Sequence, residues 1–394
     1  LHRRRHSFPT RRSSDLRQRV GWIVSRDTSA LDESGVAKAG MDTGVARRPI
    51  LDMDGYVQSL KARMDPTAAI LQGIHARARQ AQARMIFAEG DDLRVLRAAV
   101  AWQRGGMGQS LVVGREAEVK ETLEAAGLGD AVRELTVVNS ANTRHLETYQ
   151  NALYARLQRK GFDREDAFKL AARDRHVFAS LMLLHGHGDG LVTGATRKNA
   201  PTLSQIGKVF DVTPDDGAVG LTAVLHNGRI IVIGDTLVHE WPDAEDLADI
   251  ATRGAHVARG LGLEPRVAFL SFSNFGYPLS ERAVKMAHAT EVLDRRGVDF
   301  EYEGEMTVDV ALNPVQAAKY PFSRLTGPAN VLVVPARHSA SISVKLLQEM
   351  AGATVIGPIL TGVPLPIQIC STGSTVNDIL NMAAIAAGQL GQIR

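Results

Sequence analysis

Cysteine is nearly absent from this 394-residue sequence, which contains only Cys370. A single cysteine excludes an internal disulfide framework and a zinc site built from cysteines, and it predicts a reducing compartment, the cytoplasm. Long hydrophobic runs are also missing, since stretches such as Val331–Val334 are only as long as a strand. A membrane-spanning helix needs about 20 apolar residues, so no membrane partner is expected.

Several motifs of cofactor-binding enzymes and hydrolases are absent too. The sequence has no Walker motif, no HExxH and no GxSxG. The segment HGHGDG, His185–Gly190, alternates glycine with other residues, but Leu191 stands where the last glycine of GxGxxG would be. On an extended segment, His185 and His187 would point to opposite sides and make a poor metal pair. The sequence therefore predicts no nicotinamide site and no metal site in this chain.

Charge is concentrated at the start of the chain. Residues 1–17 contain six arginines and one aspartate and carry +5, which leaves −2 on the rest of a chain with formal net charge +3. A body near neutrality does not favour nucleic-acid binding. The basic tail is interpreted as a nucleic-acid arm, a transit peptide or a non-native segment. Because HSFPTRRSSDL resembles a cloning or sequencing-adapter scar, residues 1–16 are assigned to a non-native tail and left out of the fold prediction.

Short apolar runs that alternate with helical patterns predict an α/β fold with a mostly parallel sheet. The sequence His226-Asn227-Gly228 predicts a hairpin, because Asn-Gly readily adopts the left-handed conformation that such turns need. The predicted strands are 85–88, 110–114, 136–138, 218–225, 229–233, 267–272, 300–302 and 331–334; the predicted helices include 67–83, 244–261, 279–297, 342–350 and 376–387.

Four segments, in this order, resemble the phosphate acetyl/butyryl transferase (phosphotransacetylase) family. They are Phe87–Asp92 with Arg94–Leu96, Gly188–Ala195, Glu264–Ser273, and Gly357–Gly362 followed by QICSTGSTVNDIL, Gln368–Leu380. The resemblance implies two α/β subdomains with mostly parallel sheets and a cleft between them. It places subdomain I at 66–206 and 363–394 and subdomain II at 207–362, and it implies self-association through subdomain II, as a dimer or higher oligomer.

The family transfers an acyl group between phosphate and coenzyme A, which requires a base, oxyanion donors and positive charge for the phosphate. The resemblance implies that Ser371 is the oxyanion donor and Asp378 the base. Thr372 stands where active members have a phosphate-binding arginine. A second family arginine is also missing, because Ser204 and its neighbours lie where it should be, with Arg197 and Lys198 out of register. A hydrogen bond to a charged group contributes about 1.5–3 kcal/mol, so losing two would slow transfer roughly 10²–10⁴-fold.

The same positions have structural interpretations, and these stay open. Asp378 sits at a helix start and could only complement the helix dipole, and Ser371 could be an ordinary turn residue. The residues after the 267–272 strand lie where open α/β sheets bind ligands, yet they could form a plain loop. The candidate acetyl-CoA cleft residues are Thr193, Gly194, Thr196, Arg197, Ser271, Ser273, Asn274, Asp309, Asn313, Ser371 and Asp378, and Ser371, Thr372 and Asp378 are the degenerate catalytic positions.

Residues Glu33–Tyr56 resemble the end of the catalytic region of bacterial NADP-dependent malic enzymes that carry a fused phosphotransacetylase-like domain. Residues 17–65 are therefore assigned to the end of that region plus a linker. Val45–Pro49, VARRP, matches the close of their nicotinamide-binding region, and Asp65–Thr67, DPT, matches their linker. This resemblance implies an acetyl-CoA-sensing regulatory domain whose parent decarboxylates malate oxidatively with NADP and Mg²⁺ or Mn²⁺. The alternatives are an active phosphate acetyltransferase, with Arg197 or Lys198 supplying the lost charge, and a purely structural oligomerisation module.

Overall fold

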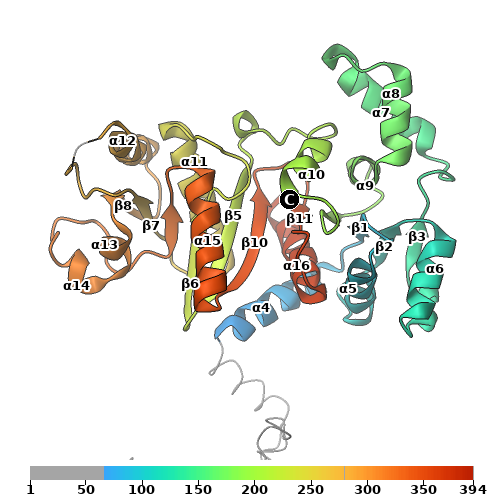
Figure 1. Ribbon diagram of the computed structural model, residues 1–394, viewed down its shortest axis with the longest axis horizontal. Coiled ribbons are helices and arrows are strands. Elements are labelled where there is room, and N and C mark those ends of the chain that lie inside the picture. The colour runs from blue at the N-terminus through green and yellow to red at the C-terminus, as the bar shows by residue number, and fades with distance from the viewer. Residues whose placement is uncertain (1–65, 279, 394) are drawn as a thin grey trace, which may run out of the picture. The chain divides into compact units, whose positions relative to one another are not determined.

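The computed structural model describes residues 66–278 and 280–393, so the predictions for residues 1–65 lie outside the described part. Two sheets organise this part (Figure 1). One sheet is entirely parallel and the other mostly parallel, which confirms the predicted α/β fold. Within residues 66–278 and 280–393, no helix is long and apolar enough to cross a membrane.

The first sheet has the strand order β11-β4-β1-β2-β3. Its strands are β1 (Met85–Phe87), β2 (Ser110–Val113), β3 (Thr136–Val138), β4 (Gly190–Thr193) and β11 (Ile367–Ile369). The last strand comes from the C-terminal part of the chain and pairs with β4, which in turn pairs with β1. Because parallel strands end at the same edge, the loops after β1, β4 and β11 lie side by side.

Both faces of the first sheet are covered by helices. Met85 and Phe87 pack in one apolar cluster, whereas Ile86 packs in a second cluster on the other face. This double burial explains why the strands read as short continuous apolar runs. The first cluster includes residues of α4 (Pro66–Ala81), α5 (Leu93–Arg104), α6 (Glu116–Ala125) and α16 (Val376–Ile393); the second includes residues of α7 (Leu146–Leu157), α8 (Arg164–Arg173), α9 (Arg175–Leu184) and α10 (Asn199–Ile206).

The second sheet has the order β10-β5-β6-β9-β7-β8. Asn227 and Gly228 have φ angles of 46° and 74°, so the Asn-Gly hairpin between β5 and β6 is confirmed. The strands are β5 (Val219–His226), β6 (Arg229–Gly234), β7 (Arg266–Leu270), β8 (Glu301–Met306), β9 (Val331–Val333) and β10 (Thr354–Thr361). The remaining helices are α11 (Ala244–Gly260), α12 (Glu281–Arg296), α13 (Val308–Leu312), α14 (Pro314–Ala317) and α15 (Arg337–Ala351), with short 3₁₀ turns at Gly129–Arg133, Gln158–Lys160 and Pro214–Asp216.

Most predicted strands lie close to their predicted bounds, but β4, β10 and β11 were not predicted. The helix predicted at 376–387 continues to Ile393, and two further predictions were also wrong in extent. The strand predicted at 300–302 continues through the EGEM sequence to Met306, and the helix predicted from Ile342 begins at Arg337. Among the described residues, those from Ile70 onward form one compact unit that contains both sheets. The boundaries proposed between subdomains I and II stay a prediction.

Candidate functional site

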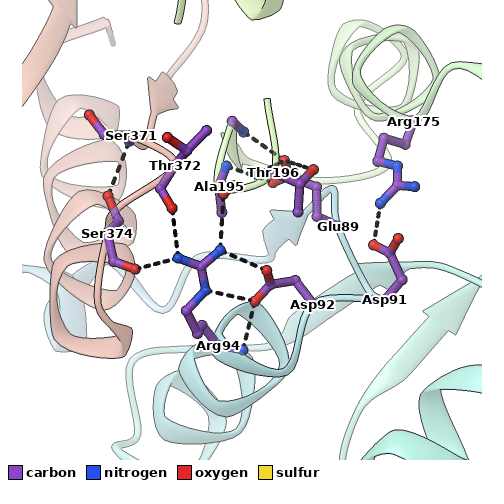
Figure 2. A network of polar contacts seen from close by, with 11 residues as sticks. Glu89, Asp91, Asp92, Arg94, Arg175, Ala195, Thr196, Ser371, Thr372 and Ser374 are labelled. Atoms are coloured by element: carbon purple, nitrogen blue, oxygen red, sulfur yellow. Dashed lines mark hydrogen bonds and ion pairs between the residues drawn. The ribbon is translucent and has the colours of Figure 1, made fainter. Parts of the chain in front are cut away.

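Loops from three neighbouring strands meet at the carboxyl edge of the first sheet. They follow β1, β4 and β11 and contain Glu89–Asp92, Gly194–Thr196 and Ser371–Ser374 respectively. Figure 2 shows their polar side chains and backbone atoms converging on two charged groups, Glu89 and Arg94. We call these three segments the loop site.

Glu89 holds the loop after β4. Its side chain is only 1% exposed, and its carboxylate accepts hydrogen bonds from the backbone N–H groups of Gly194 (3.2 Å), Ala195 (3.2 Å) and Thr196 (3.0 Å) and from Thr196 Oγ1 (2.9 Å). Burial raises the pKa of Glu89, and these hydrogen bonds oppose that rise. Gly194 has φ +97°, and a Cβ there would lie 2.7 Å from Cys370 O, so the loop needs glycine to approach β11.

Arg94 joins all three loops. It pairs with Asp92 through Nη2–Oδ2 (2.8 Å) and Nε–Oδ1 (3.1 Å), and Asp92 also caps α5. Its other N–H groups donate to three carbonyl oxygens, those of Thr372 (2.9 Å), Ser374 (3.0 Å) and Ala195 (3.1 Å). These contacts use all five donors of the guanidinium group. The backbone after β11 is therefore fixed by a cation from α5.

The loop after β11 leaves one hydroxyl free at the position predicted for the oxyanion donor. Ser371 N donates to Ser374 Oγ (3.1 Å), and Ser374 N donates to Ser371 O (2.9 Å), so the two serines close a turn. Within the described part of the chain, Ser371 Oγ has no hydrogen-bond partner. Thr372 is exposed and contributes only its carbonyl to the network, so its side chain could be enlarged without displacing a neighbour.

Asp378 closes a capping box at the start of α16. Asp378 Oδ2 accepts from Thr375 N (2.8 Å) and Thr375 Oγ1 (2.8 Å), while Thr375 Oγ1 accepts from Asp378 N (3.2 Å). This arrangement stabilises the helix start, as the structural interpretation of Asp378 expects. No hydrogen bond to Oδ1 occurs among the described residues, so one carboxylate oxygen is available for a ligand.

Thr193 and Arg197 take part in a second polar group beside the loop site. Thr193 Oγ1 lies 2.5 Å from Nδ1 of the buried His176, and burial lowers the pKa of His176 to about 4. Arg197 Nη1 lies 2.9 Å from Asp174 Oδ2, and Asp174 also caps α9. The charge of Arg197 is thus neutralised locally, whereas Lys198 is exposed and forms no ion pair with a described residue.

Acid should destabilise the fold through His176. The unfolded chain binds a proton near the ordinary pKa of 6.5, but folded His176 stays neutral down to about pH 4. The unfolded state therefore holds more protons between these values, and stability falls as the pH drops through this window, by about 3 kcal/mol in all. Urea unfolding at pH 7 and pH 4.5 should show a smaller acid-induced loss for His176→Gln than for the unmodified chain. The same substitution at the exposed His226 should leave the loss unchanged, and an equal effect at both histidines would refute this account.

The candidate residues of the second sheet form hydrogen bonds between loops of that sheet. Buried Ser273 donates to Glu305 Oε1 (2.9 Å) and lies 3.2 Å from Ser271 Oγ. Asn274 Oδ1 accepts from Thr307 N (2.8 Å) and Thr307 Oγ1 (3.1 Å). These contacts tie the end of β7 to the end of β8. No hydrogen bond or ion pair among the described residues joins Ser271, Ser273 or Asn274 to the loop site.

Asp309 and Asn313 lie at the starts of α13 and α14 and are exposed. A hydrogen bond from Thr307 lowers the pKa of Asp309, and Asn313 Oδ1 accepts from Val315 N (2.9 Å). The structure thus brings Thr193, Gly194, Thr196, Ser371 and Thr372 together at the first sheet. It leaves the second-sheet candidates in separate local networks.

The prediction that His185 and His187 point to opposite sides was wrong. His185 ends α9 and Gly186 has φ +70°, so the segment turns rather than extends. The two imidazole rings stack with centroids 6.4 Å apart, and Tyr149 packs against both. Among the described residues, no group of three or more His, Cys, Asp or Glu could hold a metal ion.

The two sheets, with polar loops at the carboxyl edge of the first, define a phosphotransacetylase-like α/β protein. A phosphotransacetylase from Streptococcus pyogenes superimposes with a TM-score of 0.76 at 29% identity, covering 83% of this chain and 99% of that one. The chain belongs to the phosphate acetyl/butaryl transferase family, whose model matches residues 69–387.

Two kinds of curated relative match this chain. The NADP-dependent malic enzyme of Rhizobium meliloti (strain 1021) is 46% identical over 356 residues, covering 90% of this chain and 47% of the relative. The phosphate acetyltransferase of Acetivibrio thermocellus is 32% identical over 337 residues, covering 83% of this chain and 99% of the relative. The chain therefore spans about half the length of the malic enzyme and nearly all of the acetyltransferase. The predicted kinship with the C-terminal region of NADP-dependent malic enzymes is confirmed.

The malic enzyme match also reaches further toward the start of the chain. It covers 90% of the chain, which is more than the stretch from Pro66 to Arg394 contains, so it includes residues before Pro66. The match to the acetyltransferase covers 83% of the chain, so it does not have to include residues before Pro66. The sequence before Pro66 thus carries similarity to malic enzymes, as its VARRP and DPT segments predict.

Proposed function

We propose that this chain is the acetyl-CoA-sensing regulatory domain of an NADP-dependent malic enzyme and has little or no acetyltransferase activity of its own. The proposal rests on the loop after β11, where Thr372 has no positive charge. The guanidinium group that contacts this loop, that of Arg94, uses all of its N–H donors in hydrogen bonds within the protein, so none is left for phosphate. The extended similarity to malic enzymes before Pro66 supports the same assignment.

The loop after β11 and the start of α16 keep polar groups that can contact a thioester, but they lack the cations that phosphate transfer needs. Ser371 Oγ could donate to a thioester carbonyl, and Asp378 Oδ1 could accept from a ligand N–H or hydroxyl. Phosphate transfer needs cations at the phosphoryl oxygens. Arg94 cannot bind phosphate without breaking its present contacts, because all five of its donors are used. Arg197 donates through Nη1 to Asp174, whose carboxylate neutralises its charge. Binding without efficient transfer is the expected behaviour.

The acetyl-CoA site can be tested with Gly373, which lies in the loop after β11. It is exposed and has an ordinary φ, and a Cβ there would meet nothing within 4 Å. Gly373→Leu should therefore fold normally yet obstruct a ligand held against the loop. In a thermal-shift titration, acetyl-CoA should raise the Tm of the unmodified chain. Gly373→Leu should need at least about tenfold more acetyl-CoA for the same rise in Tm. Equal responses would place acetyl-CoA elsewhere and refute the assigned site.

The alternative function is an active phosphate acetyltransferase, converting acetyl-CoA and phosphate into acetyl phosphate and CoA. The retained Ser371 and Asp378 and the similarity to the Acetivibrio thermocellus enzyme favour it. Lys198 is then the available cation, because Arg197 is engaged. Substantial turnover that disappears in Lys198→Ala would establish this alternative.

The oxidoreductase chemistry is proposed to belong to the part of the malic enzyme that this chain does not span. The segment that alternates histidine with glycine forms a helix end rather than a dinucleotide loop, and the described residues include no metal-binding cluster. We place the parent enzyme in the cytoplasm, where its cofactor and malate are available.

We further propose that two copies associate through α15. Ile342, Leu346 and Met350 are 59%, 53% and 83% exposed and are spaced four residues apart, so they form one apolar stripe. The stripe is symmetric about Leu346, and an antiparallel pairing of two α15 helices would place Leu346 on its counterpart and Ile342 on Met350.

Charge in the centre of that stripe should separate the copies. Leu346→Glu would bury two carboxylates against each other and weaken the dimer about 100-fold or more. Gln348→Glu adds the same charge on another side of α15 and should leave the association intact. Light scattering over a dilution series measures both. An unchanged mass for Leu346→Glu would exclude this interface.

A further inference from the structure

A hollow separate from the loop site lies among α4, α11, β10 and α16. Its volume is about 300 Å³, which reaches the lower end of the range of small-molecule sites in proteins. Its apolar walls are formed by Ile74, Val257, Leu261, Ile359, Ala384 and Ile385. We call it the α11–α16 pocket. None of its lining residues belongs to the loop site, and Gly388 on its wall lies about 15 Å beyond Asp378 along α16.

Gly388 keeps this pocket open. It lies inside α16, where glycine is less stable than alanine, and its φ is not in the left-handed region. A Cβ at Gly388 would meet nothing within 4 Å, so no close approach requires glycine there. Gly260, also on the pocket wall, has the same open space. The missing side chains leave open volume, and nothing else in the helix packing accounts for Gly388.

The rim of the pocket is cationic. Arg77 donates one hydrogen bond, from Nη2 to Gly260 O (2.9 Å), and is otherwise exposed. An adjoining hollow of about 550 Å³ shares His256, Thr361 and Gln389 with the pocket and carries Arg253. Within residues 66–278 and 280–393, Arg253 forms no hydrogen bond or ion pair.

The other charged groups on these walls are already engaged. Arg259 pairs with Asp299 (3.0 Å). Asp211 pairs with Arg156, and Asp216 accepts from Thr213. Arg77 and Arg253 are therefore the cations on these walls that have no ion-pair partner among the described residues, while Asp216 keeps its negative charge in the adjoining hollow. An apolar cavity whose nearby guanidinium groups lack ion-pair partners suits a molecule with an apolar body and an anionic head.

We propose that the α11–α16 pocket binds a small amphipathic anion, a carboxylate or phosphate monoester whose hydrocarbon body fills the cavity and whose head group is held by Arg77 or Arg253. Such a ligand contacts α4 and α16, which pack on the first sheet, and α11, which packs on the second. The site is independent of the acetyl-CoA site proposed for the loops.

Sodium octanoate is a suitable probe, because it joins a flexible apolar chain to one carboxylate. In an NMR titration of the full chain, octanoate should bind saturably and shift signals of α11 and α16. Gly388→Leu should fill the cavity, raise the Tm through better helix propensity and abolish octanoate binding. Gly388→Ala should raise the Tm as well but retain most of the binding, which separates cavity volume from helix stability.

The head-group contact has its own test. One of the two variants, Arg77→Gln or Arg253→Gln, should weaken octanoate binding about 10- to 100-fold, because it removes the arginine that binds the carboxylate. The same variants should leave binding of octan-1-ol unchanged. If neither variant affects octanoate, the pocket does not select an anion and the proposal is wrong.

The two glycines also separate this site from the loop site. Gly388→Leu should remove the octanoate response and preserve the acetyl-CoA response, whereas Gly373→Leu should do the reverse. Octanoate binding that is unsaturable, or that survives in Gly388→Leu, would overturn the proposal whatever the fate of acetyl-CoA. Loss of both responses in Gly388→Leu would show one shared site and would equally contradict it.

Discussion

Glu89→Ala should lower the free energy of unfolding by about 3–5 kcal/mol. The substitution leaves the buried N–H groups of Gly194 and Ala195 without their acceptor, together with the part-buried N–H and hydroxyl of Thr196. Each buried donor left unpaired costs about 1–3 kcal/mol. Urea denaturation followed by circular dichroism measures the loss.

Two matched variants show whether the lost hydrogen bonds cause the lower free energy of unfolding of Glu89→Ala. Glu89→Gln keeps one carbonyl oxygen for the donors that Oε1 now serves, so its loss should be smaller than that of Glu89→Ala. Glu116→Ala, at an exposed position on α6, should change stability by less than about 0.5 kcal/mol. A Glu89→Ala loss no larger than the Glu116→Ala loss would show that Glu89 does not organise the loop after β4.

Thr372→Arg should produce acetyl transfer where the unmodified chain shows little. Thr372 is exposed and its side chain makes no contact that the loop needs, so an arginine can be accommodated. One restored contact between arginine and phosphate should raise the rate about 10- to 100-fold, and adding Ser204→Arg should raise it toward 10²–10⁴-fold. Release of free CoA thiol from acetyl-CoA and phosphate measures the rate.

Thr372→Leu is the control for this gain, because it changes size without adding charge. It should bind acetyl-CoA and show no transfer above that of the unmodified chain. If Thr372→Arg and Thr372→Arg/Ser204→Arg bind acetyl-CoA and transfer no faster than Thr372→Leu, the missing cations are not the reason for low activity.

Most strands could be predicted from the sequence because both sheets are buried, and burial requires apolar runs of strand length. β4, β10 and β11 were not predicted as strands. The Asn-Gly hairpin could also be predicted, because its turn depends on local conformation alone. The His185–His187 segment could not, because its geometry depends on where α9 ends. A left-handed Gly186 brings together two rings that an extended chain would separate.

The candidate site was predicted in part. Thr193 ends β4, Gly194 follows it, and Ser371 and Thr372 come after β11. The sequence predicted neither strand, and the family resemblance alone grouped these residues. Glu89 and Arg94 were noted only within a motif, and their roles as acceptor and donor for distant loops depend on the pairing of β1, β4 and β11. Charged residues directly after a buried strand were the available signal.

The most direct test of the central claim is one calorimetric titration of acetyl-CoA into the chain in phosphate buffer, followed by assay of acetyl phosphate in the same sample. The phosphate acetyltransferase of Acetivibrio thermocellus, prepared identically, serves as the active control. The account predicts saturable acetyl-CoA binding and acetyl phosphate at least about 100-fold below the control. Turnover comparable to the control, or no binding of acetyl-CoA, would contradict it.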